Sequence, residues 1–229
     1  MKAIIMCGGL GTRLRPYTFT IPKPLFPIGD KPILELIIVN LKKFGFNDII
    51  LVVGYQSEII KSYFNNGAKL GVNISYFEEK EPLGTAGALS AIKKQFSINE
   101  TVLVKNGDIL TNIDLNKLIK FHNENNSNLT VAVKKHNVQL KYGIIEVDDN
   151  KITSIKEKPS FDYIISAGIY LLEPNCLDLI PLNKHFDFPR LIQESVRTNK
   201  KVMSYLFDDD WVSLEHVNDL EDIDKFIRK

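Results

Sequence analysis

Cysteine is scarce in this chain, and the familiar metal-binding motifs are missing from it. The 229 residues include two cysteines, Cys7 and Cys176, and neither a CxxC nor an HExxH spacing occurs. Two cysteines are too few for a disulfide framework, and the missing spacings argue against the common zinc sites. The sequence therefore predicts a reduced protein without disulfide bonds.

Long apolar runs and an excess of charge of one sign are also missing. No segment approaches the roughly 20 apolar residues of a membrane span, and the apolar start MKAIIMC reaches glycine too soon for a signal peptide. The Lys and Arg residues number 29 and the Asp and Glu residues 28, which leaves a formal net charge of +1. This balance disfavours nucleic acid and membrane surfaces as main partners. We therefore expect a cytoplasmic protein in which basic residues act locally.

Strand-like and helix-like segments alternate in the first half of the chain. Short apolar runs over 2–6, 48–53 and 101–106 are separated by segments with helical spacing, among them 32–45 and 84–95. This alternation predicts right-handed βαβ units and a mostly parallel sheet with helices on both faces. The prediction is a Rossmann-like, doubly wound α/β fold.

A smaller, β-rich part is expected from Leu129 onward. Strand-like segments such as 129–135 and 164–173 follow one another there with few helices between them. No internal repeat, low-complexity tract or long linker separates the two parts. We therefore predict a single domain over 1–229, made of a first half over 1–128 and a second half over 129–229.

The segment MCGGLGTRLRPYTFTIPKPL places bare backbone and positive charge directly after the first expected strand. In doubly wound sheets, ligands bind outside the carboxyl ends of the strands, where a glycine-rich turn lets backbone N–H groups approach phosphate oxygens. Basic side chains add the charge that a triphosphate requires. The residues that would supply these groups are Gly8, Gly9, Gly11, Arg13 and Lys23.

Two common nucleotide motifs do not fit this segment. A Walker A loop needs Gly-Lys-Ser/Thr where this chain has GGLGTR, and a dinucleotide fingerprint needs a third glycine where Leu14 stands. A nicotinamide-dependent dehydrogenase is therefore disfavoured.

The arrangement GGLGTRLRP followed by PKPL instead resembles the sugar-1-phosphate nucleotidyltransferases. Members of that family have a consensus close to GGxGTRLxPLT followed by PKPL. Further segments follow in the family's order: EPLGTAGAL (81–89), NGDIL (106–110), YGIIEVDD (142–149), IKEKPS (155–160) and SAGIYLL (166–172). The likeness is greatest to enzymes that make GDP-sugars, such as mannose-1-phosphate guanylyltransferases.

The resemblance implies a reaction, a cofactor and a set of partners. A sugar 1-phosphate oxygen attacks the α-phosphorus of a nucleoside triphosphate, GTP being favoured, and releases pyrophosphate and an NDP-sugar. The expected cofactor is Mg²⁺, the expected assembly is a homodimer, and the product feeds nucleotide-sugar pathways such as those of bacterial surface polysaccharides. Since the nucleophile is already an anion, catalysis needs alignment and charge neutralisation rather than a general base.

The resemblance assigns the catalytic roles to charged residues. Arg13 would bind the leaving pyrophosphate, Lys23 the α-phosphate and Lys158 the sugar phosphate. Asp108 follows a strand, and its carboxylate suits Mg²⁺, which prefers one or two carboxylates together with phosphate oxygens and water. The alternatives are that the basic residues are solvated and that Asp108 caps a following helix.

The nucleotide is expected in the first half of the chain. Glu81 would accept from guanine N1–H and N2–H₂, whereas uracil offers a single N3–H donor, so a carboxylate there favours GTP. The alternative is a solvated Glu81. The residues expected to contact the nucleotide are Cys7, Gly8, Gly9, Gly11, Thr12, Glu81, Gly84, Thr85 and Gly107.

The sugar phosphate is expected in the second half of the chain. The resemblance implies contacts from Gly143, Glu157, Ser166 and Gly168, with Glu157 accepting from vicinal hydroxyl groups. Ser166 stands where many relatives have Asn, which changes the hydrogen-bonding groups and leaves the identity of the sugar open.

The family pattern is broken near the C-terminus. Relatives have Trp-x-Asp-Ile/Val-Gly, and that Asp is a second metal ligand, but here Trp211 is followed by Ser213 and Glu215. Two hypotheses follow. The first is an active enzyme whose metal uses Asp108, phosphates and water, with Glu215 as a further candidate partner of the metal and a solvated Glu215 as the alternative. The second is a catalytically weak regulatory subunit that binds NDP-sugars. Retention of the four catalytic residues favours the enzyme.

Overall fold

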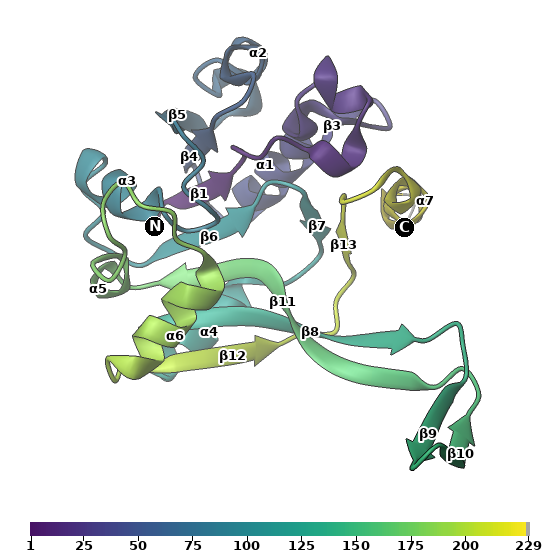
Figure 1. The fold of residues 1–229 in the computed structure, drawn as a ribbon. Helices are drawn as coiled ribbons and strands as arrows, with labels where there is room; N and C mark the ends of the chain where they lie inside the picture. Colours follow the sequence, from purple (N-terminus) through teal and green to yellow (C-terminus); the bar gives the residue numbers. More distant parts are fainter. Residues whose placement is uncertain (228–229) are drawn as a thin grey trace.

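One seven-stranded sheet organises the chain, for which a computed structural model describes residues 1–227 (Figure 1). In spatial order its strands are β12 (Val202–Leu206), β8 (Leu129–Gln139), β11 (Ser160–Leu172), β6 (Val102–Asn106), β1 (Ala3–Met6), β4 (Asp48–Val53) and β5 (Asn73–Glu78). β6, β1, β4 and β5 are parallel neighbours, whereas β11 runs antiparallel to both β6 and β8. Strands from both halves of the sequence therefore share one sheet, and the doubly wound, mostly parallel fold is confirmed.

Helices cover both faces of this sheet. They are α1 (Ile33–Lys43), α2 (Ser57–Phe64), α3 (Leu89–Gln95), α4 (Leu115–Glu124), α5 (Pro174–Leu177), α6 (Phe188–Arg197) and α7 (Leu220–Ile227). Adjacent residues of β1 are buried in different cores: Ile5 packs with Ile37 of α1, and Ile4 packs with Leu89 of α3 and Leu191 of α6. Burial on both faces explains why these strands read as continuous apolar runs. No helix within residues 1–227 is long and apolar enough to cross a membrane.

Short elements complete the architecture. The two-residue strands β2 (Pro27–Ile28) and β3 (Lys31–Pro32) pair with each other, and β7 (Ile109–Thr111) pairs with β13 (Trp211–Ser213). The 3₁₀ helices are η1 (Thr12–Leu14), η2 (Tyr17–Phe19), η3 (Lys23–Leu25), η4 (Ala68–Leu70) and η5 (Val217–Asp219).

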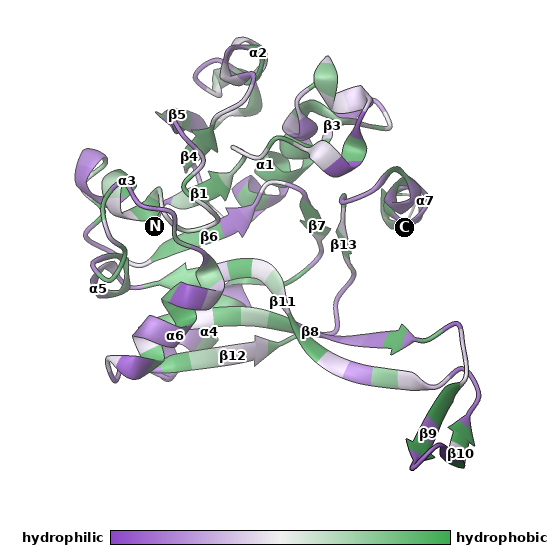
Figure 2. Cartoon of the chain, viewed as in Figure 1, coloured by the Kyte–Doolittle hydropathy of each residue, from purple (hydrophilic) through white to green (hydrophobic). Residues whose placement is uncertain are grey.

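An arm leaves the body of the protein where β8 and β11 continue beyond their neighbours (Figure 1). The two strands stay paired from Gln139 and Ser160 inward, and the arm ends in the hairpin of β9 (Ile144–Asp148) and β10 (Lys151–Lys156). Figure 2 shows hydrophobic residues along this hairpin, although its side chains are largely exposed. The β-rich part of the second half therefore consists partly of a projecting structure.

One expected helix begins later than its sequence pattern indicates. The helical spacing over 84–95 predicts a helix from Gly84, but α3 begins at Leu89. Gly84 has φ +81°, and a Cβ atom on Gly87 would lie 2.7 Å from the Lys184 carbonyl oxygen. Because the chain turns here against a distant segment, residues 84–88 form a loop rather than the first turn of the helix.

Candidate active site

A cavity of about 340 Å³ opens at the carboxyl ends of β1 and β6. This is the edge of the sheet at which doubly wound proteins bind their ligands. The lining residues are Met6, Cys7, Gly8, Gly9, Gly11, Lys23, Pro24, Glu79, Pro82, Gly84, Thr85, Asn106, Gly107 and Asp108. Most of the residues predicted to contact the nucleotide are therefore brought together from three separate loops.

Glycine is required at two positions of the cavity wall, Gly11 in the glycine loop after β1 and Gly107 in the turn after β6. Gly11 has φ +61°, and a Cβ atom there would lie 2.8 Å from Thr18 Cγ2. The same Thr18 donates from its hydroxyl to the Gly11 carbonyl oxygen at 2.9 Å. A Cβ atom on Gly107 would lie 2.8 Å from the Met6 carbonyl oxygen and 2.9 Å from Cys7 Sγ. Both turns are thus packed against their neighbours, and both line the cavity.

Cys7 lies at the start of this loop as a buried free thiol. Its backbone N–H donates to the Val52 carbonyl oxygen at 2.8 Å, which continues the sheet into the loop. Burial, assisted by the charge of Asp108, raises the pKa of the thiol well above its usual value of 9.0. The neutral thiol packs beneath the cavity and has no activated form for nucleophilic chemistry.

Lys23 and Asp108 meet at one end of the cavity. Lys23 Nζ donates to Asp108 Oδ2 at 2.5 Å, with side-chain exposures of 19% and 27%. The Asp108 carbonyl oxygen accepts from the Leu214 N–H at 2.9 Å, which ties this turn to β13. Asp108 is not a helix cap, because α4 is capped by Asp114, which accepts from Asn116 N–H and Lys117 N–H. The carboxylate is therefore free of a structural capping role and faces the cavity.

The loop at Gly84 and Thr85 is held by a residue that sequence reasoning missed. Asp187 Oδ1 accepts from the Thr85 N–H at 2.8 Å and from the Thr85 hydroxyl at 3.1 Å. Thr85 Oγ1 in turn accepts from the Phe188 N–H at 2.9 Å. The sequence signal for Asp187 was its place just before the Phe-Pro start of α6, which is typical of an N-terminal helix position. No sequence pattern indicates that its partner would be Thr85, about a hundred positions away.

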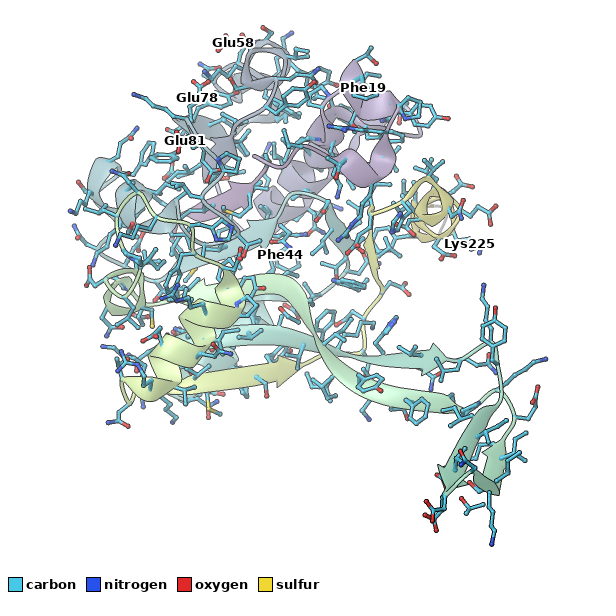
Figure 3. All side chains as sticks on the ribbon, viewed as in Figure 1. Phe19, Phe44, Glu58, Glu78, Glu81 and Lys225 are labelled. Atoms are coloured by element: carbon cyan, nitrogen blue, oxygen red, sulfur yellow. The ribbon has the colours of Figure 1, made fainter. Side chains whose placement is uncertain are left out.

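The carboxylate at the cavity wall belongs to Glu79, not to Glu81. Glu81 is exposed and is not among the lining residues, whereas Glu79 is. Figure 3 labels Glu78 and Glu81 near the end of β5. Glu78 is bound on the outer side, where it accepts from Ser57 Oγ and Lys61 Nζ, both at 2.7 Å. Alternation along the strand therefore turns the next residue, Glu79, toward the cavity.

The Glu79 carboxyl has one oxygen without a hydrogen-bond partner among the described residues. This atom, Oε1, is buried. Burial raises the pKa of this carboxyl, and a hydrogen bond from the Leu83 backbone partly offsets the rise. A buried acceptor without a partner costs free energy, which a ligand donor would recover.

Arg13 lies beside a second, smaller cavity of about 230 Å³. Its Nη1 donates to Glu215 Oε2 in an ion pair between side chains that are 64% and 47% exposed. The lining residues of this cavity are Gly11, Thr12, Arg13, Leu14, Lys23 and Glu215. Ser213 pairs with Ile109 in the β7–β13 ladder, one residue from Asp108. Glu215 therefore has Arg13 as its partner in this structure, and its predicted role toward a metal stays a prediction.

The residues predicted to bind the sugar phosphate lie in two places. Gly143, Glu157 and Lys158 are exposed on the arm and line neither cavity, so the structure does not bring them to Asp108. Gly168 has φ +68° at a bulge in β11, and a Cβ atom there would lie 2.7 Å from Nδ2 of Asn106, a lining residue. Ser166 Oγ lies 2.9 Å from the Tyr170 hydroxyl. The predicted sugar contacts of all of these residues stay predictions.

A buried lysine near Asp108 was also missed. Lys105 in β6 is 2% exposed, and its Nζ donates to the Ile109 carbonyl oxygen. Burial lowers its pKa to about 7, against an opposing effect of the Asp108 charge. Its place directly after the apolar run Val102–Val104 gave the sequence signal, since lysine is rarely buried without a partner.

The donor set fits a divalent ion that is held mainly by its substrate. Within residues 1–227, no group of three or more His, Cys, Asp or Glu side chains is arranged to hold a metal. Asp108 supplies one carboxylate at the cavity. Magnesium is commonly bound by one or two carboxylates with phosphate oxygens and water rather than by an all-protein cage.

Comparisons with known proteins agree with this geometry. A family model described as nucleotidyl transferase matches residues 2–229. The chain is 41% identical over 216 residues to D-glycero-α-D-manno-heptose 1-phosphate guanylyltransferase of Campylobacter jejuni, covering 93% of this chain and 94% of that protein. It is 36% identical over 211 residues to the protein of the same name from Aneurinibacillus thermoaerophilus, covering 91% of this chain and 90% of that one.

Solved structures share the fold. A putative glucose-1-phosphate thymidylyltransferase from Bacillus anthracis superposes with a TM-score of 0.80 at 22% identity, covering 100% of this chain and 96% of that one. HddC from Yersinia pseudotuberculosis superposes with a TM-score of 0.77 at 25% identity, covering 99% of both chains.

Proposed function

The chain belongs to the nucleotidyl transferase family, and we propose that it joins GTP to a sugar 1-phosphate, giving a GDP-sugar and pyrophosphate. The observation that carries this proposal is the cavity in which the glycine loop, Lys23, Asp108 and the buried carboxyl of Glu79 converge. Guanylyltransferase relatives that match nearly the whole chain support the same reaction. Their names point to a heptose 1-phosphate as the first sugar to test.

The reaction requires alignment more than acid–base chemistry. An oxygen of the sugar phosphate forms a bond to the α-phosphorus of GTP, and the bond from that phosphorus to the bridging oxygen of the β-phosphate breaks. Backbone N–H groups of the glycine loop and Lys23 would hold the triphosphate, and Arg13 would bind the departing pyrophosphate. Electrostatic stabilisation of this kind is worth several kcal/mol, about 3 per lost donor.

Asp108 would hold a divalent ion, for which we propose Mg²⁺. When bound, the ion neutralises negative charge on the triphosphate. In this structure Lys23 Nζ donates to Asp108 Oδ2 at 2.5 Å. On binding of the nucleotide, the Lys23 ammonium would exchange this carboxylate for a phosphate oxygen, and Asp108 would be released toward the ion.

Glu79 takes the role of reading the base in place of Glu81. Guanine presents N1–H and N2–H₂ side by side, and a carboxylate accepts both. Two observations support this role: Glu79 lines the cavity with its buried Oε1 unpartnered among the described residues, and Glu81 is exposed outside the lining. Uracil offers one donor and would leave an acceptor unpaired.

The sugar phosphate would bind between the β11 bulge and the arm. Gly168 lies near the cavity through Asn106, and Ser166 lies two residues earlier on the same strand. Lys158 and Glu157 on the arm would approach when the sugar phosphate binds. A cytoplasmic location, a homodimeric assembly and a role in surface polysaccharide synthesis are further parts of the proposal.

A matrix of substrates tests the function. Purified protein with Mg²⁺ is supplied with each of GTP, UTP, CTP, dTTP and ATP against heptose, mannose, glucose and glucosamine 1-phosphates, and pyrophosphate release is followed. The expected result is turnover with GTP and one or few sugars. Tight binding of a GDP-sugar with no turnover for any pair would instead identify a regulatory subunit.

A further inference from the structure

The phosphate end of the site contains a carboxylate, that of Glu215, which pairs with Arg13 rather than with a substrate group. Two cation–carboxylate pairs lie there: Lys23 with Asp108, and Arg13 with Glu215. Lys23 and Arg13 both line the 230 Å³ cavity, and Glu215 lines it as well. An anion that enters this cavity therefore meets two basic side chains, one of which is already paired with Glu215.

The backbone holds Glu215 firmly opposite Arg13. Leu214 is fully buried, and its N–H donates to the Asp108 carbonyl oxygen at 2.9 Å. The N–H groups of Glu215 and His216 both donate to Asp219 Oδ2 at 2.6 Å. The backbone of Glu215 is thus held in a turn after β13, from which its side chain reaches Arg13.

We propose that Glu215 is an internal counter-anion that occupies Arg13 in the empty site and is displaced by the terminal phosphates of the nucleotide. Guanidinium groups bind carboxylates and phosphates through the same paired N–H geometry, so the two anions compete for Arg13. Near this pair, Lys23 and Asp108 neutralise one another. Arg13 is therefore the cation for which Glu215 and the phosphates compete. Glu215 therefore lowers the affinity of the phosphate subsite. This inference rests on the proposed role of Arg13 toward pyrophosphate.

The test is the affinity for inorganic pyrophosphate, measured by calorimetry without metal at low ionic strength. Glu215→Gln keeps the size of the side chain and removes its charge. The variant is expected to bind pyrophosphate about two- to fivefold more tightly than the wild type, the range that exposed ion pairs support. Glu221→Gln, on the exposed side of α7, is the matched control for loss of one negative charge and should leave the affinity unchanged.

A double-substitution cycle separates this inference from the proposed function. Arg13→Ala should weaken pyrophosphate binding, and adding Glu215→Gln to it should bring no further change. The inference is overturned if Glu215→Gln alone binds no more tightly than wild type, or if its gain persists without Arg13. If Arg13→Ala leaves the affinity unchanged, the role of Arg13 in the proposed function fails, and the inference fails with it.

Discussion

The buried Lys105 makes a measurable prediction about stability and pH. It lies in β6, three residues before Asp108, and donates to the Ile109 carbonyl oxygen. Burial lowers its pKa from 10.5 to about 7. Lys105→Met keeps an apolar stem of similar length and removes the titrating group, so the pH dependence that belongs to this lysine should disappear.

The sign and size follow from proton linkage. Between pH 7 and the pKa of the unfolded chain, the unfolded state holds more protons at this lysine than the folded state, so the free energy of unfolding rises with pH. Taking pKa values of about 7 folded and 10.5 unfolded, the rise is about 1.5 kcal/mol between about pH 7 and pH 8.5. The window stops there because Cys7, whose pKa is raised in the fold, ionises in the unfolded chain near 9.0 and lowers stability at higher pH.

Urea unfolding at the two pH values gives the measurement. Between about pH 7 and pH 8.5, the free energy of unfolding of the wild type should rise by about 1.5 kcal/mol more than that of Lys105→Met. The absolute stability of the variant also contains the cost of the unpaired Ile109 carbonyl, about 1–3 kcal/mol, and this cost is the same at both pH values. Lys117→Met, on the exposed side of α4, is the control and should follow the wild type. Parallel pH dependence in wild type and Lys105→Met would refute the assignment of a neutral buried lysine.

Three further predictions concern the reaction itself. Glu79→Gln should lower the ratio of kcat/KM for GTP to that for UTP by about tenfold, equivalent to about 1.4 kcal/mol, whereas Glu81→Gln should leave it unchanged; the reverse pattern would return base reading to Glu81. Lys158→Ala should lower kcat/KM for the sugar phosphate and Arg13→Ala that for the triphosphate, each by about a hundredfold, and full turnover of both at subsaturating substrate would contradict the site. Asp108→Asn should abolish Mg²⁺-dependent turnover in a titration of the ion, and an unchanged Mg²⁺ requirement would remove Asp108 from the metal.

The parts of the fold that depend on local signals were predictable from the sequence. The apolar runs of β1, β4 and β6 and the glycine loop after β1 could be located because burial and turn chemistry act over a few residues. The start of α3 could not, because the residues from Gly84 to Ala88 are held by Asp187 and its neighbours about a hundred positions away.

The same distinction applies to the site. Glu81 is predicted to read the base from its place in the EPLGTAGAL segment, but Glu79 is the residue that lines the cavity. Glu79 directly follows β5, and its N–H still pairs with the Val53 carbonyl oxygen at 2.9 Å. The Arg13–Glu215 pair joins residues 202 positions apart, so no local sequence pattern predicts it.

Formation of the product is the most direct test that this cavity transfers a guanylyl group. GTP, Mg²⁺ and heptose or mannose 1-phosphate are incubated with the wild type and with Lys23→Met, and the nucleotides are separated and identified by mass spectrometry. The wild type is expected to form a GDP-sugar and an equal amount of pyrophosphate, and the variant at least about a hundredfold less product. Equal GDP-sugar formation by both proteins, or none from the wild type with any sugar 1-phosphate, would contradict this function.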